Sequence, residues 1–359
     1  MNIRDVYSAK AIALRHREVA SNKQAYLGKG LFPVKKKTGL DLKWVKTSKG
    51  LAVSLMPSAF DTRSTIRSRE GFKMTETEMA FFKESTLVKE QDEQEIMRIQ
   101  DSAEPFAKEV LDRIYDDVET LLEGAEVVPE RMRMQLLSAE DGHPGISISA
   151  DGANYKYNYD PDGSYEANNF TELIGTDMWS DTVNSNPIQD VMDAQDAVEA
   201  KTGTKPSILI VSKQTMNWLK QNVKVREYTL AQNVTANIIM TDNRVKDTFL
   251  AELGVSIIVY SKSYKDETGM VKKFYPDGMA TLIPSDAPLG NTWYGMTPEE
   301  RTLMSRPGAD VEIVDGGVAV SVTVTEDPVQ TKTTVSEICL PSFERMDETY
   351  TLKVGAVSY

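Results

Sequence analysis

The sequence of 359 residues is poor in the side chains that most often bind metals or form cross-links. It has one cysteine, Cys339, and two histidines, His16 and His143. A single cysteine excludes an intramolecular disulfide framework and fits a reducing compartment, and we expect Cys339 to be a buried strand residue. Neither histidine has a second histidine or a cysteine at ligand spacing, so we expect no metal site and no cofactor.

Long hydrophobic runs and catalytic motifs are absent as well. No stretch of eighteen apolar residues occurs, so we expect no membrane-spanning helix, and the first twenty residues do not have the pattern of a secretory signal. The sequence contains no Gly-x-Ser-x-Gly motif, phosphate-binding loop or dinucleotide fingerprint. Ser212 follows a buried strand, where a nucleophile can lie, but a helix cap explains it better. The sequence therefore predicts no catalytic residue and a protein that is not an enzyme.

What the chain does have is enough apolar residues for a core, 40%, and an uneven charge distribution. Its net charge is −13. Residues 1–75 hold 16 Lys and Arg against 5 Asp and Glu, a net of +11, whereas residues 76–130 hold 5 against 17, a net of −12. A basic segment followed by an acidic one indicates two surfaces that meet, either within one chain or between chains.

The basic N-terminal segment predicts little regular structure beyond a weak amphipathic helix up to about residue 25. Gly28, Gly30, Pro33 and Gly39 then interrupt the chain, so we expect an extended arm. Its basic run, residues 35–37, suits either nucleic acid or an arm that is solvated or contacts another subunit.

A strand is expected at residues 50–57, ended by Pro57, and a long polar segment follows at residues 61–85. Almost nothing in the first twenty residues of this segment suits a hydrophobic core, so we expect it to find no packing partner in its own chain.

Residues 88–123 predict one long helix. Apolar side chains recur there at steps of three and four, Gly124 is placed to end the helix, and Pro105 predicts a kink. The stripe consists of Ile96, Ile99, Ala103, Ala107, Val110, Ile114, Val118 and Leu121.

The remaining chain predicts an antiparallel sheet and an α/β unit. "MRMQLL", "ISISA" and "YKYNYD", within residues 125–170, alternate with the period of strands, and Tyr155, Tyr157 and Tyr159 share one face as a cross-strand ladder. Residues 186–203 predict a helix between Pro187 and Gly203. Buried strands at 208–211 and 254–261, the cap at Ser212 and two strands in 269–284 complete the unit. Two C-terminal strands are expected to join the sheet of 125–170.

Several of these motifs resemble those of the phage lambda-type major capsid proteins, the major capsid protein E family. Met56-Pro57 and Ile66-Arg67-Ser68-Arg69-Glu70-Gly71 resemble the family's Ser-Pro and Ile-Arg-Ser-Arg-Gly-Gly signature. "MWSD" at 178–181 and the run from Ile257 to Asp277, with its Tyr-Ser-x-x-Tyr turn and Phe-x-Pro-Asp strand, also have counterparts. The chain departs from the pattern at Glu70, where the family tends to have Gly, and has a longer acidic helix.

The resemblance implies an α+β protein with the Hong Kong 97-type capsid fold. Its parts here are an N-terminal arm (1–49), an extended E-loop (50–87), a discontinuous peripheral domain with a long spine helix and an antiparallel sheet (88–186 plus 331–359), and an axial α/β domain (187–330). It implies a major capsid protein of a tailed bacteriophage, which assembles in the host bacterial cytoplasm through pentamers and hexamers into an icosahedral shell around double-stranded DNA. The implied partners are other copies, scaffolding or decoration proteins and the portal. The DNA is enclosed without specific binding, and no membrane is involved.

A polar loop without a partner in its own chain can reach a neighbouring subunit, and this predicts the subunit contacts. We expect Arg63, Arg67, Arg69 and Lys73 to meet the acidic face of the neighbour's spine helix, formed by Asp92, Glu93, Asp112 and Asp116. Three alternatives stay open: an encapsulin-like compartment that encloses enzymes, a cytoplasmic α/β enzyme, and a nucleic-acid-binding protein that uses the basic arm.

Overall fold

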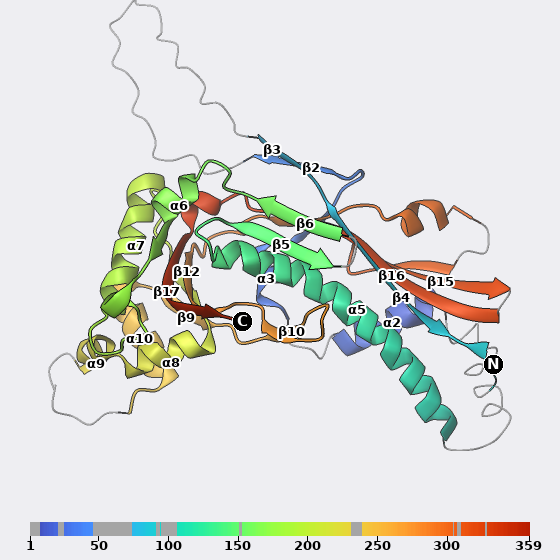
Figure 1. Ribbon diagram of the computed structural model, residues 1–359, viewed down its shortest axis with the longest axis horizontal. Helices are drawn as coiled ribbons and strands as arrows, with labels where there is room; N and C mark the ends of the chain where they lie inside the picture. Colours follow the sequence, from blue (N-terminus) through green and yellow to red (C-terminus); the bar gives the residue numbers. More distant parts are fainter. Residues whose placement is uncertain are drawn as a thin grey trace, which may run out of the picture. The chain divides into compact units, whose positions relative to one another are not determined.

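The computed structural model describes residues 8–20, 25–45, 74–90, 94, 106–150, 153–230, 239–303, 305–306, 310–326 and 329–359 (Figure 1). The chain divides into two compact units. Unit 1 comprises 1–42, 76–131 and 291–342, and unit 2 comprises 43–75, 132–290 and 343–359. The strand expected at 50–57 lies outside the described residues.

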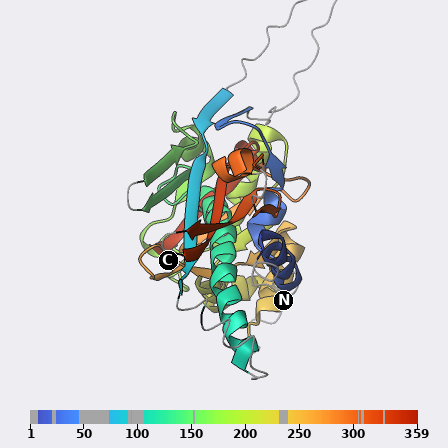
Figure 2. The ribbon, with the colours of Figure 1, turned by 90° about the vertical axis from the view of Figure 1, so that its right-hand side faces the viewer.

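Unit 1 contains a six-stranded sheet built around the long strand β16. β4 pairs antiparallel with β16 along one edge, and β15 and then β13 pair along the other. Figures 1 and 2 both show β4, in cyan, running beside β16. Cys339 is fully buried between Ala80 and Tyr294, as expected. The strands are β1 (Val34–Lys36), β4 (Ala80–Val88), β13 (Asn291–Tyr294), β14 (Asp310–Val314), β15 (Val318–Glu326) and β16 (Val329–Ser342).

Residues 80–85, at the end of the polar segment 61–85, belong to this sheet, which corrects the expectation that the segment lacks a partner in its own chain. β4 pairs with β16 over nine residue pairs, from Ala80↔Cys339 to Val88↔Thr331. Met79 and Ala80 are buried. The strand was missed because backbone hydrogen bonds, which do not depend on apolar side chains, make up most of this pairing.

The N-terminal arm is more regular than its glycines suggest. Helix α2 (Ala9–Ala20) confirms the predicted amphipathic helix, but a short helix α3 (Leu27–Leu31) and strand β1 replace the expected extended arm. The Gly28 amide donates to Glu130 Oε1 at 3.0 Å, and Phe32 is fully buried. Tertiary contacts therefore override the low helix propensity of glycine here.

Helix α5 (Phe106–Ser138) is long, as predicted, but its bounds differ from 88–123. Val88 belongs to β4, and the helix continues through Gly124 and Pro129. "MRMQLL" is helical and not a strand, because a helix buried on several sides hides the periodicity that would identify it. The hydrophobic residues buried in this part are Met132, Met134, Leu136 and Leu137. The division between the two units falls within α5, after Arg131.

The end of α5 is fixed inside unit 2. Ala139 adopts a left-handed conformation with φ of 40°, which stops the helix. The carbonyl oxygen of Leu137, which the helix itself leaves without a partner, accepts hydrogen bonds from Thr281 Oγ1 at 2.7 Å and Thr351 Oγ1 at 3.3 Å. No helix within the described ranges is long and apolar enough to cross a membrane.

Unit 2 is organised around a five-stranded sheet in the order β7-β17-β12-β8-β9. β8 and β9 are parallel, and Figure 1 shows helices α7 to α10 gathered beside this sheet. A buried cluster including Trp179, Phe249 and Leu282 joins these helices to the strands. The strands are β7 (Phe170–Glu172), β8 (Ile208–Val211), β9 (Ser256–Val259), β12 (Asp277–Ile283) and β17 (Tyr350–Ser358).

The helices of unit 2 are α6 (Ser164–Asn169), α7 (Pro187–Thr202), α8 (Lys213–Gln221), α9 (Val223–Leu230) and α10 (Asp242–Leu253). Of these, α7 and α8 lie where the sequence predicts a helix. Ser212 Oγ accepts from the Thr215 amide at 3.1 Å, which confirms the predicted cap of α8. Gly203 ends α7 with φ of 75°, a conformation that glycine adopts without steric cost.

The C-terminal strands confirm the expected elements but not their partners. β17 pairs with β12 and β7 in unit 2, and β16 lies in unit 1. The predicted hairpin, β5 (Gly145–Ala150) with β6 (Ala153–Asn158), forms a separate two-stranded sheet. On it the rings of Tyr155 and Tyr157 stack 6.4 Å apart along β6, and across the hairpin these residues pair with Ile148 and Ile146. The expected return of the C-terminal strands to this hairpin is therefore wrong, because a strand's sequence does not specify its distant partner.

The smaller elements complete the description. β2 (Asp41–Val45) pairs with β3 (Met74–Glu78), and β10 (Ser263–Lys265) pairs with β11 (Val271–Lys273). β11 and β12 are the two strands predicted within 269–284. Single turns of helix occur at 175–177 and 346–348, and a π-helical turn at 299–303. The two compact units do not follow the predicted domain bounds, which remain a prediction for the assembled protein.

Candidate subunit-contact surfaces

The predicted basic contact residues Arg63, Arg67, Arg69 and Lys73 lie outside the described residues. The structure does describe the two ends of the segment that carries them. β2 and β3 pair on either side of residues 46–73, and the Met79 amide donates to the Leu40 carbonyl at 2.9 Å. The segment therefore begins and ends at one paired stem.

The predicted acidic contact residues are described only in part. Asp92 and Glu93 lie outside the described residues, and Asp112 lies in α5 at a position where only the backbone is described. Asp116 is 73% exposed, and its carboxylate lies 3.7 Å from Arg15 Nη2 of the same chain. Asp116 is therefore accessible, but a basic residue of the N-terminal segment already lies beside it.

The N-terminal segment meets the acidic helix α5 within unit 1. Figures 1 and 2 show α2 beside α5. His16 Nδ1 lies 3.1 Å from Glu119, and Lys29 Nζ lies 3.9 Å from Glu126. For the residues that the structure describes here, the basic and acidic segments therefore meet within one chain.

A group of ionisable side chains, of which His16 is buried and Glu126 and Asp315 are partly accessible, forms where α2, α5 and the β14–β15 turn meet. His16 is almost fully buried, and its Nε2 lies 4.0 Å from Asp315. Burial, together with a hydrogen bond to Asp315, raises the pKa of Glu126. A hydrogen bond shared by the carboxyl groups of Glu126 and Asp315 indicates that too little positive charge lies nearby to neutralise both of them.

The lysine run of the predicted arm has partners within its own chain. Lys35 Nζ lies 5.4 Å from the centre of the Trp293 ring, Lys36 Nζ lies 2.5 Å from Glu300, and Lys37 Nζ donates to the Asp41 carbonyl at 2.7 Å. The run lies at a sheet edge, because β1 pairs in parallel with β13. These contacts favour a structural role over nucleic-acid binding.

A second charged contact anchors β4 in unit 1. Lys83 Nζ forms an ion pair with Glu299, and Ser336 Oγ donates to the same carboxylate at 2.8 Å. Burial alone would raise the pKa of Glu299, but the hydrogen bonds from Lys83 and Ser336 outweigh it and lower the pKa. This contact joins β4 to the turn at 299–303 and to β16, both of which are far from β4 in the sequence.

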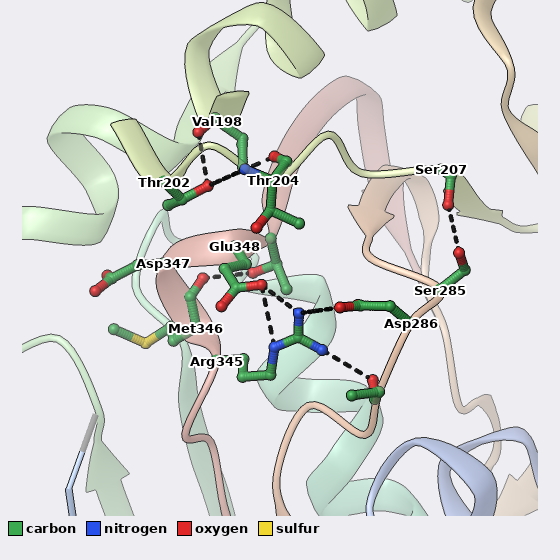
Figure 3. Close-up of polar contacts among 12 residues, drawn as sticks. Val198, Thr202, Thr204, Ser207, Ser285, Asp286, Arg345, Met346, Asp347 and Glu348 are labelled. Carbon is green, nitrogen blue, oxygen red and sulfur yellow. Dashed lines mark hydrogen bonds and ion pairs between the residues drawn. The ribbon is translucent and has the colours of Figure 1, made fainter. Parts of the chain in front are cut away.

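In unit 2, Arg345 forms a comparable group of charged contacts (Figure 3). Its guanidinium contacts both oxygens of Asp286, at 2.9 and 3.2 Å, forms an ion pair with Glu348, and donates to the Ala287 carbonyl at 3.2 Å. Arg345 therefore ties together the segment by which the chain leaves unit 2 and the segment by which it returns.

Unit 2 has an open hollow of about 440 Å³. His143, Glu140, Tyr157 and Tyr359 line it. The His143 ring lies between two carboxylates, with Nδ1 3.2 Å from Asp160 and Nε2 3.3 Å from Glu166. Asp160 also accepts from Ser164 and the Glu166 amide, so this group is explained by the turn that it stabilises.

Sequence reasoning missed the contacts of His16 and Lys83, because their partners lie more than a hundred residues away. One signal for His16 was available. It follows Ile12 and Ala13 at helical spacing, so it lies on the buried stripe of α2, where an ionisable residue requires a partner.

Comparisons with known proteins agree with this architecture. A family model described as phage major capsid protein E matches residues 15–354. Among curated proteins, no sequence matches this chain. A putative prophage capsid protein from E. coli CFT073 is similar in structure, with a TM-score of 0.60 and 15% identity over 97% of this chain and 99% of that chain. A phage-related protein from Bordetella bronchiseptica RB50 has a TM-score of 0.57 and 18% identity over 96% and 97%.

Proposed function

This chain belongs to the phage major capsid protein E family, and we propose that its copies assemble through pentamers and hexamers into an icosahedral shell around double-stranded DNA. The observation that carries the proposal is the family match, which extends in order over residues 15–354. The protein has the Hong Kong 97-type fold, a mixed helix and sheet architecture, and its role is structural.

Membership of this family allows each part of the fold to be assigned to a domain of the capsid protein. Helices α7 to α10 and the strands β8, β9 and β12 lie in the axial domain, proposed as 187–330, whereas β7 and β17 of the same sheet lie in the residues proposed as peripheral. The spine helix α5 belongs to the peripheral domain, proposed as 88–186 plus 331–359. The arm is 1–49 and the E-loop is 50–87. Strands β2 and β3 pair on either side of residues 46–73, and we propose that this segment reaches a neighbour.

Contacts between neighbouring subunits use opposite charges. Arg63, Arg67, Arg69 and Lys73 of one subunit approach the acidic face of the next subunit's α5, with Asp92, Glu93, Asp112 and Asp116. Two observations support this arrangement: the paired stem of β2 and β3, and the 73% exposure of Asp116. A single exposed pair contributes only about 0–1 kcal/mol, but repetition around each ring gives specificity through multivalency.

Assembly takes place in the host bacterial cytoplasm, with scaffolding or decoration proteins and the portal as further partners. The net charge of −13 suits a container for DNA, because a surface that bound phosphate tightly would retain the genome. The family match disfavours an encapsulin-like compartment and a cytoplasmic enzyme.

Negative-stain electron microscopy of the purified protein tests the proposed assembly. We expect closed shells, or rings of five and six subunits. A protein that stays monomeric at high concentration contradicts the proposal.

The proposed contact is tested separately by reversing the charge at Arg67 and Arg69, as Arg67→Glu with Arg69→Glu. We expect this variant to lose shells while each subunit stays folded. Combining it with Asp112→Arg and Asp116→Arg should restore some assembly, because the charge pattern is then exchanged.

A matched control reverses two exposed lysines of unit 2, Lys205→Glu with Lys213→Glu, which changes the net charge by the same amount. We expect shells from this control. Normal shells from the Arg67 and Arg69 variant would refute the E-loop contact and leave the assembly proposal intact.

A further inference from the structure

We propose that His16, Glu126 and Asp315 form a site for a divalent metal ion, Zn²⁺ in preference to Mn²⁺ or Mg²⁺. The bound ion would hold the N-terminal helix α2 against the rest of unit 1. One ligand atom from each of these residues lies within 4.8 Å of the others. The residues come from α2, α5 and the β14–β15 turn, so one ion would join three chain segments. No local motif in the sequence predicts this site, because its ligands are separated by 110 and 189 positions.

The orientation of His16 is the first argument. Its side chain is only 2% exposed, and its Nδ1 contacts both oxygens of Glu119 at 3.1 Å. A carboxylate that accepts the Nδ1 proton leaves the lone pair on Nε2, which is the atom that faces Asp315 at 4.0 Å. Glu119 is not itself a proposed ligand. It takes the outer position that a carboxylate commonly has behind a metal-binding histidine.

The distances are the second argument. Ligands bound tetrahedrally to one Zn²⁺ at about 2.1 Å are roughly 3.4 Å apart. Ligand atoms within 4.8 Å of one another therefore need to approach by at most about 1.4 Å. Side-chain rotation at Glu126 and Asp315, which are 21% and 31% exposed, is sufficient for that movement.

The charge of the group is the third argument. Two carboxylates face the imidazole, and the only described cation within ion-pair distance of both is Lys29, whose Nζ lies 3.7 Å from Asp315 and 3.9 Å from Glu126. The Lys29 side chain is 48% exposed and flexible, so it is able to leave when an ion enters. Imidazole nitrogen with carboxylate oxygen is a ligand set that favours zinc over magnesium.

The surroundings of the other histidine, His143, differ from those of His16. Both ring nitrogens of His143 lie near carboxylates, at 3.2 Å from Asp160 and 3.3 Å from Glu166. The His143 ring therefore bridges two acidic groups, whereas the Nε2 atom of His16 lies beyond hydrogen-bonding distance of Asp315. His143 supplies a matched control, since the chain has only these two histidines.

Zn²⁺ binding to the full-length protein, after removal of metal with a chelator, tests the proposal. We expect one ion per chain, and a rise in Tm of about 5 °C at a hundred-fold excess over Kd. His16→Gln should weaken binding at least ten-fold, and Glu119→Gln by about ten- to a hundred-fold. His143→Gln should bind Zn²⁺ like the unchanged protein.

Lys29→Met gives the sharpest outcome, because a site and a purely structural ion pair predict opposite effects. If the site exists, removing the competing ammonium group tightens Zn²⁺ binding several-fold. Asp315→Asn serves as the ligand variant should His16→Gln fail to fold, and it should weaken binding at least ten-fold. Equal binding by the unchanged protein and Asp315→Asn, weaker binding by Lys29→Met, or loss of binding in His143→Gln would each overturn the proposal.

Discussion

Unit 1 and unit 2 differ in how far apart their interacting residues lie in the sequence. The main core of unit 2 draws on residues 179–282, and the C-terminal strand β17 joins it. Unit 1 instead brings together three distant segments, 1–42, 76–131 and 291–342. Its sheet places β4 beside β16, about 250 positions away, and the Lys83 and His16 contacts join residues 216 and 103 positions apart. Unit 2 therefore depends largely on an apolar core from one part of the chain, and unit 1 on pairing between remote parts.

The largest expected effect comes from the core of unit 2. Phe249→Ala removes a fully buried ring from α10 and should lower the free energy of unfolding by about 3–5 kcal/mol. Leu250→Ala on the same helix is the control, because Leu250 is 56% exposed, and it should cost less than about 0.5 kcal/mol. Denaturant unfolding monitored by circular dichroism measures both. Similar losses from the two variants would contradict the described core.

A smaller loss is expected where the chain leaves and re-enters unit 2. Arg345→Ala leaves Glu348, which is 11% exposed, without its guanidinium partner and should cost about 2–3 kcal/mol. Arg345→Lys should restore only part of this loss, since an ammonium group cannot reproduce the forked contacts to Asp286 and Glu348.

Lys353→Ala is the control for Arg345, because its ion pair with Glu172 is more exposed and should contribute about 0–1 kcal/mol. Thermal unfolding compares the three variants. The assigned role of Arg345 is wrong if its truncation costs no more than that of Lys353.

In unit 1 the contact of β4 with the 299–303 turn should contribute about 1 kcal/mol, and Lys83→Met tests it. Because the folded-state pKa of Glu299 is lowered, the contribution is present at neutral pH and is lost as pH falls below the ordinary value of 4.5. The difference in free energy of unfolding between Lys83→Met and the unchanged protein should therefore disappear at acidic pH. Lys10→Met, at an exposed position of α2, should show no such pH dependence.

The smallest expected effect is at Asp190 in α7, which accepts a hydrogen bond from Trp179 Nε1 at 2.8 Å. Burial raises the pKa of Asp190 to about 6. The folded state then binds a proton more tightly than the unfolded state, so stability falls as pH rises from about 4 to about 6. Asp190→Asn keeps a hydrogen-bond acceptor for Trp179 and should remove this dependence of stability on pH. At pH 7 the free energy of unfolding should rise by about 1 kcal/mol or less.

Urea unfolding at pH 4 and pH 7 measures that slope, and Asp196→Asn on the exposed face of α7 is the control. An unchanged slope in Asp190→Asn would show that another group titrates in this range.

The comparison between the units also explains what the sequence was able to predict. Helices α7 and α8 and strands β8, β9, β11 and β12 were predicted closely, because caps such as Ser212 and Gly203 and the apolar run at 208–211 act locally. Helices α9 and α10 were not predicted. The register of β4 on β16, the partner of β17 and the continuation of α5 past Gly124 were missed, because distant contacts determine them. The capsid protein family was predicted from motifs that occur in order along the sequence. The group of His16, Glu126 and Asp315 was not predicted, because these residues come together only in the folded structure.

A cryo-electron microscopy reconstruction of the assembled particle tests the central claim, that the segment between β2 and β3 finds its partner on another copy. The account predicts a closed shell in which density for Arg67 and Arg69 lies against α5 of the neighbouring subunit. A shell, or a well-ordered monomer, in which residues 46–73 pack entirely against their own chain would contradict it.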